Sequence, residues 1–184
     1  MSKIISGTLK GICLDVFPDE HMRPTSNRAK EALFDIIQFD IKGKSFVDLF
    51  SGTGQIGIEA LSRGASKVIF VEKSRKSLKI LEKNIEKISK LIDKKSIKIY
   101  RDDAFKFLDK FEDEVDFLFS DAPFSMQINE ILYKFTKIIR DNGTIIVESP
   151  SDREQIEKFD DFHLIKKYIY GRIKFSFYKK QYEV

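Results

Sequence analysis

The chain has 184 residues, 42% of them apolar, a formal net charge of +4 and a single cysteine, Cys13. This composition is typical of a globular protein with one core, and no apolar run approaches the roughly 20 residues that a membrane-spanning helix needs. One cysteine excludes an internal disulfide, and a polar amino terminus interrupted by Gly7 and Gly11 is not a secretory signal. We therefore expect a monomeric cytoplasmic protein of one domain, with a hairpin extension over residues 1–20 and an α/β core over residues 21–184.

The first 40 residues predict a short β-hairpin and then a helix. Two short strands are expected within residues 3–17, because apolar stretches flank a glycine-containing turn. Thr25 or Ser26 is a suitable N-cap for a helix that begins near Asn27. In that helix apolar residues recur at helical spacing over residues 29–37, which predicts one buried face.

From residue 45 onward, predicted strands alternate with predicted helices. The strands are expected at 46–50, 67–72, 96–100, 115–120 and 144–148, with two more around Gly171 between residues 162 and 182. One helix is expected to end at Leu61, and three more are expected to span 74–91, 104–111 and 127–139. This alternation predicts a Rossmann-like α/β fold, a mostly parallel seven-stranded sheet with helices on both faces. In such folds ligands bind beyond the carboxyl ends of the strands.

A glycine-rich turn follows the first of these strands. Gly52 and Gly54 allow a sharp turn and a close approach of the backbone to a ligand. Glu72 ends the second strand, where a carboxylate can accept hydrogen bonds from ribose hydroxyls. Gly52, Gly54 and Gly57 match the dinucleotide-binding pattern, which favours a nicotinamide cofactor. The same loop suits S-adenosylmethionine, whose ammonium group would need a carboxylate such as Asp48, and a purely structural turn is the third interpretation.

Two further strand ends carry chemistry-bearing residues. Asp102 or Asp103 after the third strand can accept from an adenine amino group or can cap the helix that starts at Ala104.

The fourth strand leads into Asp121-Ala122-Pro123-Phe124. An exocyclic base amine is a weak nucleophile, and acceptors such as Asp121 and the Ala122 carbonyl would orient its lone pair toward a methyl donor. Pro123 stiffens the turn, and Phe124 offers a surface on which an extruded base can stack. A simple turn is the alternative interpretation.

The carboxy-terminal region is basic. Between His163 and Tyr182 it contains six cationic residues and no acidic one, namely Lys166, Lys167, Arg172, Lys174, Lys179 and Lys180. Such a stretch predicts contacts with phosphates, although lysines also protect edge strands.

These motifs together resemble the 16S rRNA guanine-N2 methyltransferase family of the RsmD type, over nearly the whole chain. The resemblance rests on the glycine-containing hairpin, Arg23-Pro24-Thr25, the loop at 48–54, Gly-Ile-Glu-Ala-Leu-Ser-Arg-Gly at 57–64, and Tyr-Gly-Arg at 170–172. It implies a class I S-adenosylmethionine-dependent methyltransferase fold. It also implies methylation of the N2 amino group of a guanine in small-subunit ribosomal RNA that is already assembled with ribosomal proteins. The sequence itself does not distinguish free RNA from an assembled particle as the substrate.

The resemblance also implies roles for individual residues. The cofactor would be bound by Asp48, Ser51, Gly52, Gly54, Glu72, Asp103 and Ala104. The target base would be held by residues 121–124, and Arg23, Thr25 and Arg28 would lie near the active site and the RNA. The basic stretch separately predicts RNA contacts by Lys166, Lys167, Lys179 and Lys180. One departure is Ala122, where the family has a proline.

Three other functions stay open at this point. Another base amino methyltransferase, for example one acting on adenine in DNA, would use the same chemistry. A nicotinamide-dependent oxidoreductase would explain Gly52, Gly54 and Glu72 but gives Asp121 no task. An RNA-binding relative without catalytic activity would bind in a salt-dependent way and transfer no methyl group.

Overall fold

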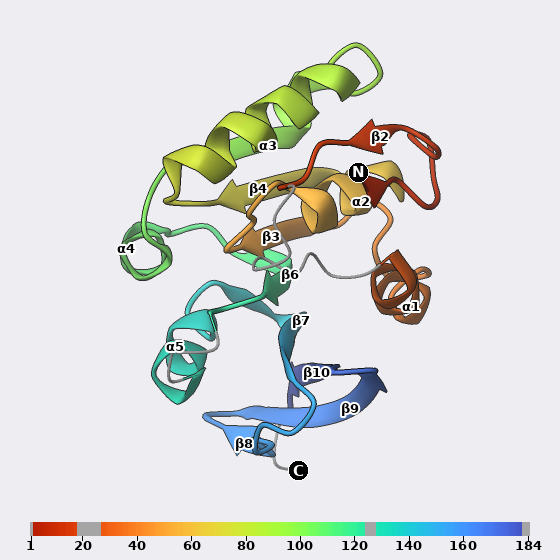
Figure 1. Cartoon of the computed structure of the whole chain (residues 1–184). Helices are drawn as coiled ribbons and strands as arrows, with labels where there is room; N and C mark the ends of the chain where they lie inside the picture. The colour runs from red at the N-terminus through yellow and green to blue at the C-terminus, as the bar shows by residue number, and fades with distance from the viewer. Residues whose placement is uncertain (1, 18–26, 124–127, 182–184) are drawn as a thin grey trace.

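The computed structural model describes residues 2–17, 27–123 and 128–181, and it contains a large sheet between two layers of helices (Figure 1). Eight strands form this sheet in the order β5-β4-β3-β6-β7-β10-β9-β8. The five parallel strands are β3 (Ser45–Leu49), β4 (Lys67–Val71), β5 (Ile97–Tyr100), β6 (Val115–Ser120) and β7 (Ile139–Pro150). The antiparallel strands are β8 (Lys158–Phe159), β9 (Phe162–Tyr170) and β10 (Ile173–Lys180).

The predicted sheet differs from this one mainly at its edges. Seven strands were expected, and β8 is the eighth. With two residues it is too short to leave a strand pattern in the sequence. Strand β7 is also longer than the predicted 144–148, because its first residue, Ile139, pairs with Val115 of β6.

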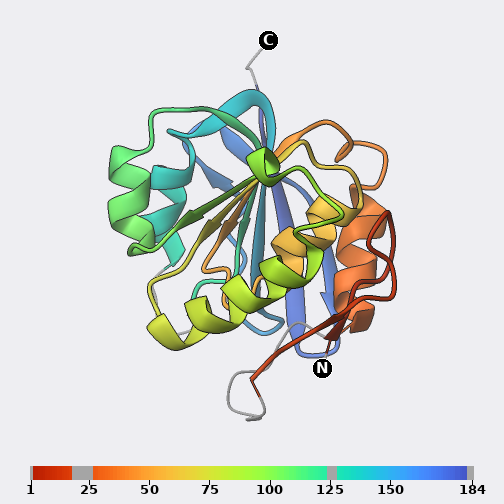
Figure 2. The same ribbon diagram turned by 90° about the horizontal axis from the view of Figure 1, so that it is seen from above.

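The helices cover both faces of the sheet (Figure 2). One face carries α1 (Asn27–Ile36), α2 (Gln55–Ser62) and α3 (Arg75–Ile88), and the other carries α4 (Ala104–Lys110) and α5 (Ile128–Phe135). A short 3-10 helix, η1 (Lys94–Ser96), precedes β5. Among the helices in the described part of the chain, none combines the length and the hydrophobicity of a transmembrane segment.

Apolar spacing explains how these layers form. On α3, Leu78, Leu81 and Ile88 are buried at helical spacing, and Ser74 caps the helix by accepting a hydrogen bond from the Ser77 amide. Strand β6 is buried along nearly its whole length, as expected for a central parallel strand covered on both faces. The predicted elements of the core are therefore present in their predicted order.

The order of the strands reverses between β3 and β6. From β3 the chain continues outward to β4 and β5 on one side, and then returns to place β6 and β7 on the other. Leu49 at the end of β3 pairs with Ser120 at the end of β6. The residues that follow these two strands consequently meet at the topological switch point, where α/β folds bind ligands.

The amino-terminal hairpin is shorter than predicted. It consists of β1 (Ser2–Lys3) and β2 (Cys13–Leu14). Ile4 still forms backbone hydrogen bonds with Ile12 and Gly11, and the turn beyond it, at residues 5–9, packs against α2. Gly7 lies so close to α2 that an added Cβ would be 1.8 Å from the Ser62 carbonyl oxygen. The close approach to the helix therefore takes the place of further strand pairing.

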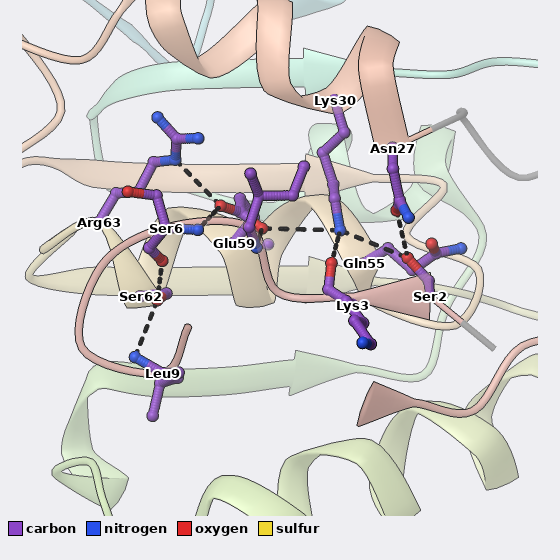
Figure 3. A network of polar contacts seen from close by, with 12 residues as sticks. Ser2, Lys3, Ser6, Leu9, Asn27, Lys30, Gln55, Glu59, Ser62 and Arg63 are labelled. Atoms are coloured by element: carbon purple, nitrogen blue, oxygen red, sulfur yellow. Dashed lines mark hydrogen bonds and ion pairs between the residues drawn. The ribbon is translucent and has the colours of Figure 1, made fainter. Parts of the chain in front are cut away.

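A buried polar network fixes this hairpin segment to the core (Figure 3). The Glu59 carboxylate of α2 accepts hydrogen bonds from the amides of Ile5 and Ser6 at 2.9 and 3.0 Å, and from Arg63 Nε at 3.0 Å. It also forms an ion pair with Lys30 of α1 at 3.6 Å, and both of these side chains are fully buried. Burial lowers the pKa of Lys30, and the Glu59 carboxylate opposes that shift. The Glu-Ala-Leu-Ser-Arg stretch at 59–63 thus anchors the amino terminus.

Candidate active site

A cavity of about 930 Å³ lies at the carboxyl ends of the parallel strands. Its volume falls within the range of small-molecule sites. The described residues that line it are 16–17, 50–53, 55–56, 71–74, 121–123 and 172–173, together with Asp48, Ser77, Asp102, Ala104, Phe119 and Glu148. Most of the predicted cofactor and target residues are thus brought together in one place.

The glycines of the loop after β3 have different tasks. Gly52 has a φ of 54° and lines the cavity, with nothing within 4 Å of the position of an added Cβ. Gly54 has a φ of 83° and is not part of the lining, and its Cβ would lie 2.3 Å from Leu81. Gly57 packs equally closely on the Phe70 ring. Only Gly52 therefore exposes backbone to a ligand, while the other two allow α2 to pack tightly.

Asp48 is a buried carboxylate in the wall of the cavity. Its Oδ2 accepts a hydrogen bond from the Gly57 amide at 2.8 Å. Burial, against the opposing Gly57 hydrogen bond and with smaller contributions from the charges of Asp121 and Glu72, raises the pKa of Asp48 to about 7. A cationic group placed beside Asp48 would stabilise its charged form.

Glu72 follows β4 and is hydrogen-bonded to the glycine loop that follows β3. Its Oε2 accepts from the Gly52 amide at 2.8 Å, and its Oε1 accepts from the Ser74 amide at 2.7 Å. Each carboxylate oxygen has a second acceptor site. Glu72 is therefore oriented by the backbone and can still accept hydrogen bonds from hydroxyl groups in the cavity.

After β5 the lining consists of Asp102 and Ala104 rather than Asp103. Asp103 caps α4 by accepting from the Phe105 amide at 3.0 Å, and it accepts a second hydrogen bond from Lys73 at 3.0 Å. Lys73 and these hydrogen bonds lower the pKa of Asp103, although its partial burial opposes them and is the largest single influence. The structure thus gives Asp103 the capping role and leaves Asp102 as the carboxylate that faces the ligand space.

Asp121, Ala122 and Pro123 follow β6 and line the cavity opposite Glu72. Asp121 is half-buried, and the loss of contact with water in the cavity wall raises its pKa to about 6. Ala122 is buried, and Pro123 is exposed. Phe124, the last residue of the predicted tetrapeptide, lies outside the described residues, as do Arg23 and Thr25.

Several residues of the lining were not among the predicted site residues. Glu148 is buried on β7, next in register to Asp121, because the preceding residues of the two strands, Val147 and Ser120, pair with each other. The signal for Glu148 was present, since it ends a predicted strand in the same way as Glu72 does. Val16 and Phe17 lack such a signal, because only the fold carries their segment to the cavity. Arg172 belongs to the basic stretch predicted to contact phosphates, but the sequence did not place it in the cavity.

The basic residues of β9, β10 and the turn between them lie at different distances from the cavity. Arg172, in the turn between β9 and β10, lines it. Lys179 follows Arg172 by seven residues along β10, which is about 23 Å at 3.3 Å per residue. Lys180 forms an ion pair with Asp141 at 3.0 Å, near the amino end of β7 and thus at the end of the strands that is far from the cavity. Lys166 and Lys167 are exposed on β9 and lie between these two ends.

Arg28 lies elsewhere, on α1. It is the second residue of that helix and is exposed. Among the predicted RNA contacts in the described part of the chain, it is the one that comes from the amino-terminal half.

Five parallel strands with a reversal at the cavity, followed by antiparallel strands, define the class I S-adenosylmethionine-dependent methyltransferase fold. A solved structure described as the putative methyltransferase yhhF from Escherichia coli superposes with a TM-score of 0.85. It is 25% identical to this chain, and the match covers 97% of both chains. The predicted fold class is confirmed.

The chain belongs to the family described as conserved hypothetical protein 95, whose model matches residues 2–179. A relative in Bacillus subtilis, the putative rRNA methyltransferase YlbH, is 31% identical over 185 residues, with 97% of this chain and 99% of the relative covered. The ribosomal RNA small subunit methyltransferase D of Haemophilus influenzae is 29% identical over 182 residues, with 96% and 93% covered. The family resemblance inferred from the sequence is confirmed.

Proposed function

We propose that this protein transfers a methyl group from S-adenosylmethionine to the exocyclic N2 amino group of one guanine in 16S rRNA, in the small ribosomal subunit or its assembly intermediate in the cytoplasm. The observation that carries the proposal is the cavity at the switch point, with Asp48 and Asp121 in its wall. The names of the relatives support methyl transfer to ribosomal RNA over hydride transfer with a nicotinamide cofactor.

The residues of the cavity fit this cofactor. Burial raises the pKa values of Asp48 and Asp121, so a cation bound in the cavity would stabilise their charged forms. Gly52 leaves room for a ligand at the backbone. S-adenosylmethionine has an ammonium group, ribose hydroxyls and an adenine. In our proposal Asp48 holds the first, Glu72 the second, and Asp102 with Ala104 the third, while Ser51 and Gly52 supply the backbone surface.

Asp121 and the residues after it would orient the target amine. When bound, S-adenosylmethionine supplies an electrophilic methyl group on its sulfonium. Asp121 accepts a hydrogen bond from one N–H of the base amine, and the Ala122 carbonyl accepts from the other, so that the nitrogen lone pair points at the methyl group. The catalytic gain comes mostly from this alignment. The raised pKa of Asp121 also allows its carboxylate to take up the proton that the methylated amine releases.

The RNA would approach from the side of Arg172. This residue lines the cavity and can pair with a phosphate next to the extruded nucleotide. Lys166 and Lys167 extend the basic surface along β9, and Arg28 adds a cation from α1. Phosphate contacts of this kind position RNA without reading its sequence.

The decisive experiment is transfer of labelled methyl groups from S-adenosylmethionine to small ribosomal subunits that lack the modification, followed by nucleoside analysis. We expect N2-methylguanosine. Labelled N6-methyladenosine would keep the chemistry and overturn the guanine assignment. Binding of S-adenosylhomocysteine without any incorporation into subunits or RNA would overturn the proposed substrate.

Asp121→Ala tests the proposed chemistry. We expect it to slow methyl transfer about a hundredfold or more, the size of a lost acid–base group, with little change in the affinity for S-adenosylhomocysteine. Asp102→Ala is the matched control, because it removes another carboxylate of the same cavity and should weaken cofactor binding while the rate at saturation is kept. Equal turnover of Asp121→Ala and the wild type would show that the amine is held elsewhere.

A further inference from the structure

Asn84 of α3 joins two segments that are far apart in the sequence. It is fully buried. Its Nδ2 donates hydrogen bonds to the Asp15 carbonyl and the Thr53 carbonyl, both at 2.9 Å, and its Oδ1 accepts from the Asp15 amide at 2.8 Å. Both amide protons and one acceptor site of the side chain are thus engaged with backbone.

Both segments that Asn84 holds are walls of the cavity. Asp15 directly precedes Val16 and Phe17, which line it from the amino-terminal segment. Thr53 is itself part of the lining and belongs to the glycine loop. A single side chain outside the cavity therefore connects the backbones of two of its walls.

Other contacts of these walls do not replace this connection. The amino-terminal segment is anchored at its beginning by the Glu59 network (Figure 3), ten residues before Asp15. Near its end, the Asp15 carboxylate pairs with Lys83 and Lys87, both at 2.7 Å, and these exposed pairs lower its pKa to about 2. They hold a side chain to α3 and do not reach the glycine loop. Within the described residues, the hydrogen bonds that link the two walls pass through Asn84.

The chemistry of the site requires an amide at this position. Two carbonyl oxygens face Nδ2, so a carboxylate there would meet them without protons to donate. An apolar side chain would leave the buried Thr53 carbonyl, and the partly buried carbonyl and amide of Asp15, without these partners, which is costly in a protein interior.

We propose that Asn84 is a positioning residue that fixes the amino-terminal segment and the glycine loop relative to each other, and so sets the affinity for the cofactor without touching it. The second half of this inference rests on the proposed function. The first half concerns the two walls alone and is measurable without any ligand.

The experiment compares Asn84→Ala and Asn84→Asp with the wild type by hydrogen exchange of peptides that contain residues 13–17 and 51–54, and by calorimetric binding of S-adenosylhomocysteine. Ile88→Val and Ile88→Ala, one turn further along the same buried face of α3, bracket the loss of stability without changing either wall. Lys83→Ala with Lys87→Ala removes the exposed ion pairs of Asp15 and keeps Asn84.

We expect both Asn84 variants to increase exchange in the two segments together and to bind S-adenosylhomocysteine about tenfold more weakly, equivalent to about 1.4 kcal/mol. The Ile88 variants, at matched stability, and the double lysine variant should stay close to the wild type. Exchange that rises in only one segment, or equally in the Ile88 variants, would overturn the positioning role. An equal loss in the lysine variant would transfer the role to the ion pairs.

The two proposals fail in different ways. If the wild type does not bind S-adenosylhomocysteine, the proposed function fails, while the exchange data still decide whether Asn84 couples the walls. If the wild type binds and Asn84→Ala binds equally well, the proposed function stands and the link from Asn84 to affinity is wrong.

Discussion

Replacing Asp48 by asparagine should make the protein more stable at alkaline pH relative to the wild type, while weakening cofactor binding. Burial raises the pKa of Asp48 from 3.8 to about 7. The folded state therefore binds a proton that the unfolded chain has already lost between these pH values, and the stabilisation from the protonated form is lost as the pH rises through about 7. Asparagine carries no charge at any pH and lacks this loss.

The size of the effect follows from the shift. Each pKa unit corresponds to about 1.4 kcal/mol. A difference of about three pKa units between the folded and unfolded states therefore changes the free energy of unfolding by about 4 kcal/mol between the fully protonated and the fully ionised forms. About half of this, roughly 2 kcal/mol, falls between pH 5.5 and 8.5, where the protein can be compared conveniently. Asp121 adds to the effect in the same direction, because removing the Asp48 charge makes its own ionisation easier.

The assay is urea unfolding followed by circular dichroism at several pH values, for the wild type and Asp48→Asn. The quantity of interest is the change with pH of the difference in the free energy of unfolding, since any fixed cost of burying the asparagine amide cancels. Asp113→Asn is the control, because Asp113 is exposed and its ion pair with Lys67 is at the surface. A difference that does not change with pH would refute the raised pKa of the buried Asp48 carboxyl group.

Two further predictions concern the anchor of the hairpin and the approach of the RNA. Glu59→Ala should lower the free energy of unfolding by about 3–5 kcal/mol, because it leaves the buried Lys30 without its counter-ion. Lys30→Met should cost clearly less in the same urea titration, since Glu59 keeps Arg63 and two backbone amides, and an equal or larger cost would contradict this asymmetry. Arg172→Ala should reduce the slope of log affinity against log salt for ribosomal RNA by about 1, measured by filter binding, whereas Lys179→Ala should leave it nearly unchanged. A similar reduction in both would show that RNA follows β10 along its whole length.

Much of the fold was predictable because it depends on local patterns. The mostly apolar run at Val115–Ser120 has the bounds of β6, and β3 and β4 lie within one residue of their predicted bounds. The predicted helix at 127–139 runs too far, because α5 ends at Phe135 and β7 already begins at Ile139. Ile138 and Ile139 suit either a helix or a strand. The pairing with β6 decides between them, and this pairing is not visible in a local pattern.

The carboxylates of the cavity were also predictable. Glu72 and Asp121 stand at or just after the end of a predicted strand, Asp48 stands two residues before the end of another, and in a parallel sheet those ends meet at one edge. The same rule applied to the fifth strand would have pointed to Glu148. Sequence alone therefore determined the fold class, the edge at which the site lies and most of its acidic residues.

Tertiary structure decided which of these residues face the ligand and which support them. It assigned Gly54 to helix packing, Asp103 to a helix cap and Asn84 to the link between two walls. It also placed Lys179 far from the cavity and Arg172 in its wall, although seven residues separate them. The reason is physical: periodicity and glycine content act over a few neighbouring residues, whereas contacts across the sheet depend on strand order and register, which the whole core sets together.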